Sequence, residues 1–257
     1  MTVNATVDSA LQDYKKHLEV QKTAETARNT DARIRKHISS ALLCTKLSAL
    51  TTRQIKLFQT SMVKNSDDPE VVRKSKDSAN RVMNMLKAAL NLAYRDGQVG
   101  TNAAWKRASN FRNVGAARIL FLTEQQVNDL LSVTSGGLHD LVEVAIHTGA
   151  RFGVLASARV SDFDPSNGTI QLTGKTGTRI TYLSDAAVKV IRKLCRNKLP
   201  TALLLVQNDG SPWIKNSYSR SLLDAIREAK LPADTVFYSL RHYHISKALL
   251  AGVNAQV

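Results

Sequence analysis

Cysteine is scarce in this sequence, and its scarcity excludes a fold held together by a disulfide framework. Cys44 and Cys195 are the two cysteines in 257 residues, and each lies among apolar neighbours. We interpret both as reduced residues of the core rather than as a disulfide or a metal-binding pair. Histidine, aspartate and glutamate do not cluster at metal-ligand spacings, and we interpret Asp162 and Asp164, which bracket a turn, as structural. The sequence therefore predicts no metal site and no cofactor.

Long apolar runs are also missing. No run approaches the roughly 20 residues that a membrane-spanning helix needs. The first residues, Met1-Thr2-Val3-Asn4, lack the basic and apolar blocks of a secretory signal. We therefore expect a cytoplasmic protein that has no membrane-spanning helix.

Acidic side chains are few compared with basic ones. The chain has 21 Asp and Glu against 36 Lys and Arg, which gives a formal net charge of +15. Residues 1–110 hold 19 basic and 10 acidic side chains, and residues 111–257 hold 17 and 11, so both parts are basic. This balance favours a polyanionic partner, either nucleic acid or an anionic membrane, over a merely soluble basic protein.

The first hundred residues show helical periodicity and no strand pattern. We expect helices at about 7–23, 25–42, 52–64 and 70–96. Basic residues lie opposite the apolar stripes, and their face either tracks DNA phosphates or is simply solvated. The candidate DNA-binding residues here are Arg33, Lys36, Lys74 and Arg81. The first hundred residues show no set of side chains suited to acid–base catalysis, so we interpret them as a binding module.

A segment without sustained periodicity follows. Residues 105–118 include Lys106 and Arg107, and we interpret them as a linker that crosses the DNA backbone; an ordinary surface loop is the alternative. The expected domains are therefore 1–104, a helical DNA-binding domain, and 119–257, a second domain joined to it by this linker.

The second domain mixes helices with one hairpin. Thr123 and Gln126 form a capping box, and an apolar helix over about 137–148 ends at Gly149. Residues 169–172 and 179–183 alternate with period two around a Gly-Lys-Thr-Gly connection. Further helices are expected at about 184–198, 217–230 and 243–251. The fold class is therefore mostly α with a small β component, with a helical bundle in front of an α+β domain.

Three basic residues of the second domain are candidates for holding one phosphate. Arg151 follows the apolar helix in Thr-Gly-Ala-Arg, Lys175 lies at the hairpin tip, and Arg241 lies in Tyr-Ser-Leu-Arg-His. Arginine offers planar paired donors and lysine a mobile charge, and fixed cations stabilise the extra negative charge of a reacting phosphate. The alternative for each arginine is an ion pair with a nearby acid such as Asp162. A nucleotide-binding loop is excluded, because its first glycine would fall at Thr169.

The order of these motifs carries a resemblance to a known family. Leu-Thr-Glu at 122–124, Thr-Gly-x-Arg, the hairpin lysine and x-x-Leu-Arg-His follow a basic helical domain. In this order they resemble the tyrosine recombinases of the phage integrase family, over nearly the whole chain and most clearly over 119–253. The resemblance implies a core-binding domain followed by a catalytic domain. It also implies double-stranded DNA, and not a membrane, as the partner, with a homotetramer on paired DNA sites and association with the nucleoid.

The resemblance also implies roles for individual residues. Arg151 and Arg241 would bind the non-bridging oxygens of the scissile phosphate, and Lys175 would protonate the leaving 5′ oxygen. Tyr238 occupies the place usually held by histidine and would hydrogen-bond the phosphate, although a phenol is a poor general base near neutral pH. His242 matches the frequent Arg-His pair and is expected to contact the phosphate-binding residues rather than the phosphate itself.

Two departures from the family pattern bear on activity. Val154 stands where the family usually has an acidic residue, and none of the six tyrosines can be assigned as the nucleophile. Tyr243 follows Arg241 too soon for that role. We therefore expect that the chain is truncated before the tyrosine that would form a 3′-phosphotyrosine intermediate, and that it binds DNA without cleaving it. The alternative is a non-catalytic DNA-binding protein built on the same fold.

Overall fold

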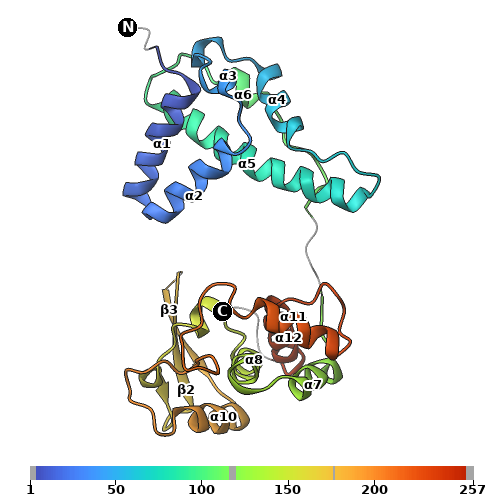
Figure 1. The fold of residues 1–257 in the computed structure, drawn as a ribbon. Coiled ribbons are helices and arrows are strands. Elements are labelled where there is room, and N and C mark those ends of the chain that lie inside the picture. The colour runs from blue at the N-terminus through green and yellow to red at the C-terminus, as the bar shows by residue number, and fades with distance from the viewer. Residues whose placement is uncertain (1–3, 116–119, 176, 253–257) are drawn as a thin grey trace. The chain divides into compact units, whose positions relative to one another are not determined.

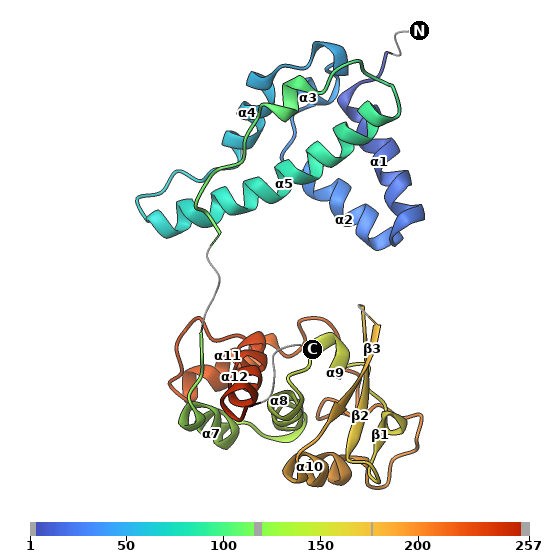
Figure 2. The same ribbon diagram turned by 180° about the vertical axis from the view of Figure 1, so that it is seen from behind.

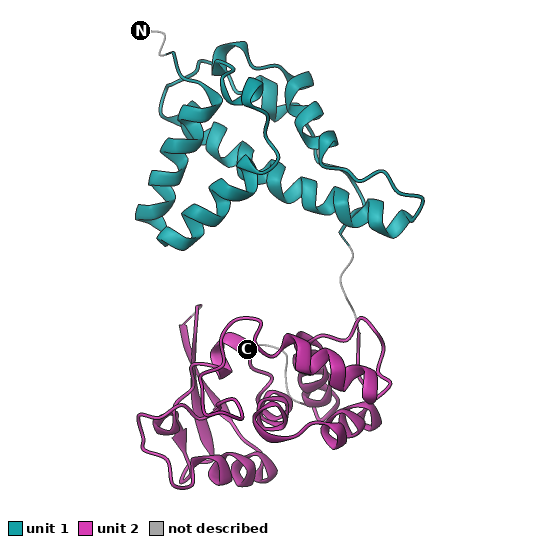
Figure 3. Cartoon of the chain, viewed as in Figure 1, with its two compact units in different colours: residues 1–117 teal, residues 118–257 magenta. Residues whose placement is uncertain are grey.

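The chain forms two compact units, which are described separately (Figure 3). The computed structural model describes residues 4–115, 120–175 and 177–252. Unit 1 comprises residues 1–117 and unit 2 residues 118–257. Thr176 of the hairpin connection, the end of the expected linker at 116–118 and the chain end at 253–257 lie outside the described residues.

Unit 1 is built from helices, as its periodicity predicts (Figure 1). Local signals set their ends: Thr6 and Thr51 form capping boxes, Asp68 caps a helix with proline in its first turn, and Gly97 follows the same helix with φ of 73°. The helices are α1 (Val7–Gln21), α2 (Ala24–Arg35), α3 (Ser40–Leu43), α4 (Thr52–Ser61), α5 (Pro69–Arg95) and α6 (Ala103–Lys106), with a 3₁₀ turn at Leu47–Ala49.

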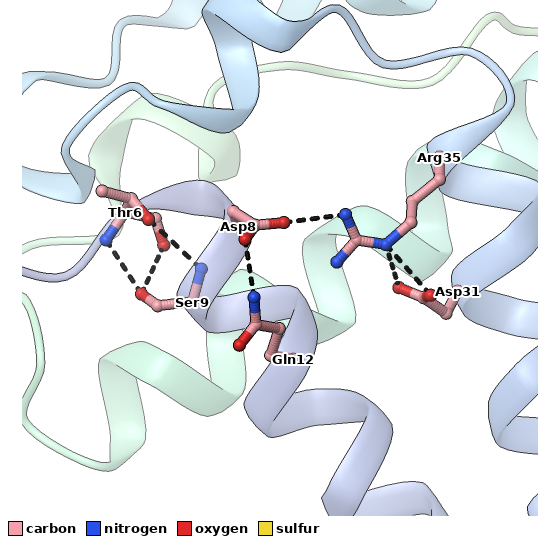
Figure 4. Close-up of polar contacts among 6 residues, drawn as sticks. All are labelled: Thr6, Asp8, Ser9, Gln12, Asp31 and Arg35. Carbon is pink, nitrogen blue, oxygen red and sulfur yellow. Dashed lines mark hydrogen bonds and ion pairs between the residues drawn. The ribbon is translucent and has the colours of Figure 1, made fainter.

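The long helix α5 is the centre of unit 1, and α1, α2 and α4 pack against it. All four helices supply core side chains, among them Leu11, Ile34, Ile55, Met83, Leu86 and Leu90. An ion-pair network also joins α1 to α2 (Figure 4). Arg35 donates to Asp8 at 2.7 Å and to Asp31 at 2.8 Å. The charge of Arg35 is therefore paired with acids inside unit 1.

Two details of unit 1 differ from the sequence-based expectation. The helix expected over 25–42 ends at Arg35, because Ser39 caps a separate short helix by accepting from the backbone N–H of Leu42 at 3.3 Å. Cys44 is exposed rather than in the core, although both cysteines are free thiols as expected.

The expected linker over 105–118 is wrong for its first ten residues. Trp105 is 1% exposed and belongs to the core of unit 1. The Asn80 side chain on α5 accepts from the backbone N–H of Phe111 and donates to its carbonyl, both at 2.9 Å. Because these contacts hold the backbone of residues 105–114 on α5, the boundary between the units falls at 117 rather than at 104.

Unit 2 combines helices with a three-stranded antiparallel sheet in the order β1-β2-β3. The hairpin register pairs Thr169 with Tyr182 and Gly174 with Gly177. The helices are α7 (Glu124–Val133), α8 (Gly136–Thr148), α9 (Phe152–Leu155), α10 (Asp185–Cys195), α11 (Ser219–Glu228) and α12 (Phe237–Leu250), and a 3₁₀ turn covers Val160–Asp162. The strands are β1 (Phe163–Asp164), β2 (Thr169–Gly174) and β3 (Gly177–Tyr182).

Helix α8 lies in the middle of unit 2, with the sheet and α10 on one side and α7, α11 and α12 on the other (Figure 1, Figure 2). It is apolar on most sides: Leu141, Val142 and Val144 are fully buried. The last helix starts at Phe237 rather than at the expected 243, so Tyr238, Arg241 and His242 lie on α12 itself. The predicted fold class, mostly α with a small sheet, is confirmed. Among the described helices, none combines the length and the apolar composition needed to cross a membrane.

Candidate functional site

The site is built around the C-terminal end of α8. Gly149 ends the helix in the left-handed region with φ of 58°, and its N–H donates to the Ala145 carbonyl at 2.9 Å. A Cβ atom on Gly149 would lie 2.5 Å from the His244 ring. Glycine is therefore required here both by the backbone conformation and by the close approach of α12. Two residues later, Arg151 leads into α9.

Three side chains from β3 and α12 donate hydrogen bonds to carbonyls in the last turn of α8 and at Gly149, which follows it. Arg179 donates to the Thr148 carbonyl at 3.4 Å, Arg241 to the Gly149 carbonyl, and His244 Nδ1 to the Ile146 carbonyl at 2.9 Å. The negative end of a helix dipole favours cations at this position. The end of α8 thus brings together arginines that are far apart in sequence.

The arginines line one small pocket. Its cavity measures about 140 Å³. The lining residues are Arg151, Val154, Leu172, Gly174, Gly177, Thr178, Arg179 and Arg241. None of these described lining residues is acidic. Val154 forms part of the apolar wall, since its Cγ2 lies 3.0 Å from where a Cβ on Gly174 would be.

The charge of this pocket is not balanced by the protein residues that the structure describes. Burial lowers the pKa of Arg179 first, and the positive charges of Arg241 and Arg151 lower it further. The Nε of Arg241 is buried and has no hydrogen-bond acceptor in the described part of the chain. A pocket with three guanidinium groups, an unpaired buried donor and no carboxylate is suited to an oxyanion.

Two of the five predicted catalytic residues, Arg151 and Arg241, therefore meet in this pocket. The alternative pairing with Asp162 is not found, because that carboxylate accepts from the backbone N–H of Arg159 at 2.7 Å. Lys175 lies exposed at the hairpin tip and does not line the pocket, although Gly174 and Gly177 beside it do.

Tyr238 and His242 lie one turn apart on α12 and contact each other rather than the pocket. Their rings meet edge to face, with centroids 4.8 Å apart, and the His242 ring also contacts Phe121 at 6.4 Å. Tyr238 is 46% exposed. The two residues therefore flank Arg241 on the same helix and leave the phenol accessible.

Two residues of the site were missed by the sequence reasoning. Arg179 stands in the alternating pattern of β3, four residues after Lys175, and pairs with the buried Leu172 across the hairpin. The residues around Arg179 in the sequence predict a strand, and nothing in them indicates that its side chain lies near Arg151. His244 is half-buried, and burial lowers its pKa, with a further lowering by Arg179 and Arg241. We find no local signal that separates it from an ordinary surface histidine.

The candidate DNA-binding residues of unit 1 fall into two groups. Lys74 pairs with Glu70 at 3.4 Å, and Arg81 pairs with Asp77 at 2.7 Å, both within α5. The others are exposed and form no ion pair or side-chain hydrogen bond with any residue in the described ranges. This second group consists of Arg33, Lys36, Lys106 and Arg107.

Comparison with known proteins agrees with the motif order. The model of the phage integrase family matches residues 120–257. None of the curated proteins matches the sequence. The fold is similar to the Tn1549 transposon integrase (residues 82–397) in complex with circular intermediate DNA, with a TM-score of 0.72 and 16% identity over 96% of this chain and 89% of that one.

Two structures of lambda integrase show the same likeness. Residues 75–356 bound to DNA align with a TM-score of 0.73 and 20% identity, covering 96% of this chain and 88% of that one. A lambda integrase tetramer bound to a Holliday junction aligns with a TM-score of 0.73 and 20% identity, covering 95% and 73%. At these identities the structures show the shared fold, and the family match covers more than half of the chain. The chain therefore belongs to the phage integrase family.

Proposed function

We propose that this protein is a site-specific DNA recombinase that holds the scissile phosphate of double-stranded DNA in the arginine pocket of unit 2. The observation that carries this proposal is the pocket itself: Arg151 and Arg241 meet there without a carboxylate, and a buried donor of Arg241 lacks an acceptor among the described residues. In an integrase-family chain, the oxyanion that such a pocket fits best is a phosphodiester of the DNA backbone.

The proposed chemistry is strand cleavage and rejoining through a 3′-phosphotyrosine intermediate. Arg151 and Arg241 bind the non-bridging oxygens and stabilise the added negative charge of the transition state more than the ground state. Lys175 swings from the hairpin tip to protonate the 5′ oxygen. Tyr238 donates a hydrogen bond to the phosphate, and His242 supports the Tyr238 ring. In this step a tyrosine oxygen bonds to the phosphorus while the bond from phosphorus to the 5′ oxygen breaks; none of the six tyrosines in the sequence is assigned as that nucleophile.

The proposed DNA partner extends to unit 1. Arg33, Lys36, Lys106 and Arg107, which are exposed and pair with no described residue, contact phosphates. Lys74 and Arg81 contribute less because each shares its charge with an acid on α5. Unit 1 thus serves as the core-binding domain and unit 2 as the catalytic domain. By analogy with the lambda integrase tetramer on a Holliday junction, the working form is a homotetramer on paired DNA sites, at the nucleoid in the cytoplasm.

The test is to replace Arg151 and Arg241 separately by alanine in the protein as its natural source produces it, called the native protein below. Each variant should lose covalent DNA cleavage on a nicked substrate, by about 10²–10³-fold for one lost oxyanion donor. Most of the DNA affinity should remain, because many other phosphate contacts are untouched. Arg196→Ala is the matched control: it removes the same charge from an exposed position outside the pocket.

Each outcome separates the proposed function from its alternative. If both arginine variants cleave as well as Arg196→Ala, the pocket is not the cleavage site. If the unaltered native protein binds its DNA site tightly but forms no covalent adduct, the non-catalytic DNA-binding protein is the better description.

A further inference from the structure

Arg179 reaches the pocket from an element that carries neither Arg151 nor Arg241. It lies on β3, opposite Leu172 in the hairpin register, and its guanidinium extends to the Thr148 carbonyl at the end of α8. Arg151 comes from the start of α9 and Arg241 from α12. The sheet, the short helix and the last helix therefore each supply one guanidinium group to the same cavity.

The contacts of Arg179 do not account for its position. The single hydrogen bond of its side chain to a described residue is the long one to Thr148, at 3.4 Å, although guanidinium carries five N–H donors. No ion pair joins it to an acid in the described ranges. Placing a partly buried cation beside two others is unfavourable for the protein alone. An anion in the pocket would offset this cost.

We propose that Arg179 is a third phosphate-binding arginine, which contacts the same DNA phosphodiester as Arg151 and Arg241. This inference rests on the proposed function of the pocket. The three arginines line the cavity from three different elements, and Val154 adds an apolar side chain that does not compete for their donors. Because none of the described lining residues is acidic, all three positive charges act on the phosphate.

The transition state is where the third arginine contributes most. A phosphodiester carries one negative charge in the ground state and about two when the phosphorus is five-coordinate, so an added cation binds the second state more strongly. Arg179 should therefore affect the rate of cleavage far more than DNA affinity. A residue that only held the hairpin on α8 would instead show its effect in stability and in affinity.

The experiment measures single-turnover cleavage and DNA affinity of Arg179→Ala and Arg179→Lys in the native protein, with Arg196→Ala as the charge-matched control. Arg179→Ala should cleave about 10²–10³-fold more slowly, the loss typical for one oxyanion donor. Its DNA affinity should fall no more than that of the control. Orthovanadate, which mimics five-coordinate phosphorus, should bind the control as it binds the unaltered protein and should bind Arg179→Ala more weakly.

Arg179→Lys separates the loss of the paired guanidinium donors from a loss of folding. It keeps a charge and a donor for the Thr148 carbonyl, but it cannot present two parallel N–H groups. Slow cleavage by a stably folded Arg179→Lys protein supports the inference. Cleavage by Arg179→Lys and Arg179→Ala at the rate of Arg196→Ala would overturn it. Arg151→Ala, run in the same assay, separates the two claims, because undiminished cleavage by that variant would refute the proposed function itself.

Discussion

Gly149 is the residue on which the geometry of the pocket depends most directly. Its carbonyl accepts from Arg241, its left-handed backbone turns the chain toward Arg151, and the His244 ring lies against its Cα. A side chain is therefore excluded here for two separate reasons, one in the backbone torsion and one in the packing of α12.

Gly149→Ala should destabilise unit 2 by about 1–3 kcal/mol, since a non-glycine residue in this conformation is strained and its Cβ would meet the His244 ring at 2.5 Å. Denaturant unfolding of the whole chain measures this change. Gly153→Ala is the matched control, because its new Cβ would meet no atom within 4 Å and its backbone is helical. Equal stability of the two variants would show that α12 does not approach α8 as closely as described.

At the scale of elements, the ends of most helices could be predicted and the contacts between them could not. Thr123 with Gln126, Asp96-Gly97 and the hairpin alternation are local signals, and the structure agrees with each. The segment after Trp105 has no periodicity of its own. Its place on unit 1 depends on Asn80, which is a contact that no local pattern records.

The same reasoning explains why the site was predicted in part. Arg151 and Arg241 stand in motifs that can be recognised along the chain. Arg179 joins them because β3 and α12 both pack at the end of α8, and this meeting exists only in three dimensions. The start of α12 was misplaced for a different reason: its N-cap position is Val236, which lacks the polar side chain that usually signals a helix start.

The pairing of α8 with α12 should also make the stability of unit 2 depend on pH. Burial is the main cause that lowers the pKa of both His147 and His244. Glu143 opposes this shift at His147, whereas Lys247 adds to it there and Arg179 and Arg241 add to it at His244. Burial between α8 and α12 thus disfavours the charged form of both imidazoles.

The direction of the effect follows from proton binding. Because the folded pKa values lie below the unfolded value of about 6.5, the unfolded chain binds protons more readily. The stability that these histidines contribute is present above that pH and is lost as pH falls through the folded values. Melting temperatures measured from pH 7 to 5 should fall, and the double variant His147→Gln/His244→Asn should show a shallower fall.

His37→Gln is the control for this series, because His37 is exposed and lies in unit 1. It should leave the slope of melting temperature against pH unchanged. Carboxylates remain ionised over most of this range and contribute little to the slope. A double variant as steep as the control would mean that other groups carry the pH dependence.

At the scale of the whole molecule, charge is the property that both units share. The net charge of +15 is spread over both parts of the chain, so each unit can neutralise DNA phosphates. Charge alone does not identify the contacts, because every strongly basic protein binds DNA with some salt dependence. The pairing of the basic residues within unit 1 gives a sharper criterion, since it separates cations that pair with an acid from cations that pair with no described residue.

Two double variants exploit this difference. Arg33→Ala/Lys36→Ala and Lys74→Ala/Arg81→Ala each remove two positive charges. In the described part of the chain, Lys74 and Arg81 pair with acids on α5, whereas Arg33 and Lys36 pair with none. Each phosphate contact contributes about −0.9 to the slope of log affinity against log salt. The first variant should therefore flatten this slope by nearly two, and the second by clearly less.

Salt titrations of DNA binding from about 50 to 200 mM, the range over which such contacts change affinity strongly, decide the matter. If Arg33 and Lys36 contact phosphates, their removal lowers affinity most at low salt, where the counterion contribution is largest. If the two variants flatten the slope equally, total charge rather than the position of unpaired cations governs binding by unit 1. If neither changes the slope, unit 1 binds DNA through another face, and the assignment of these residues as phosphate contacts is wrong.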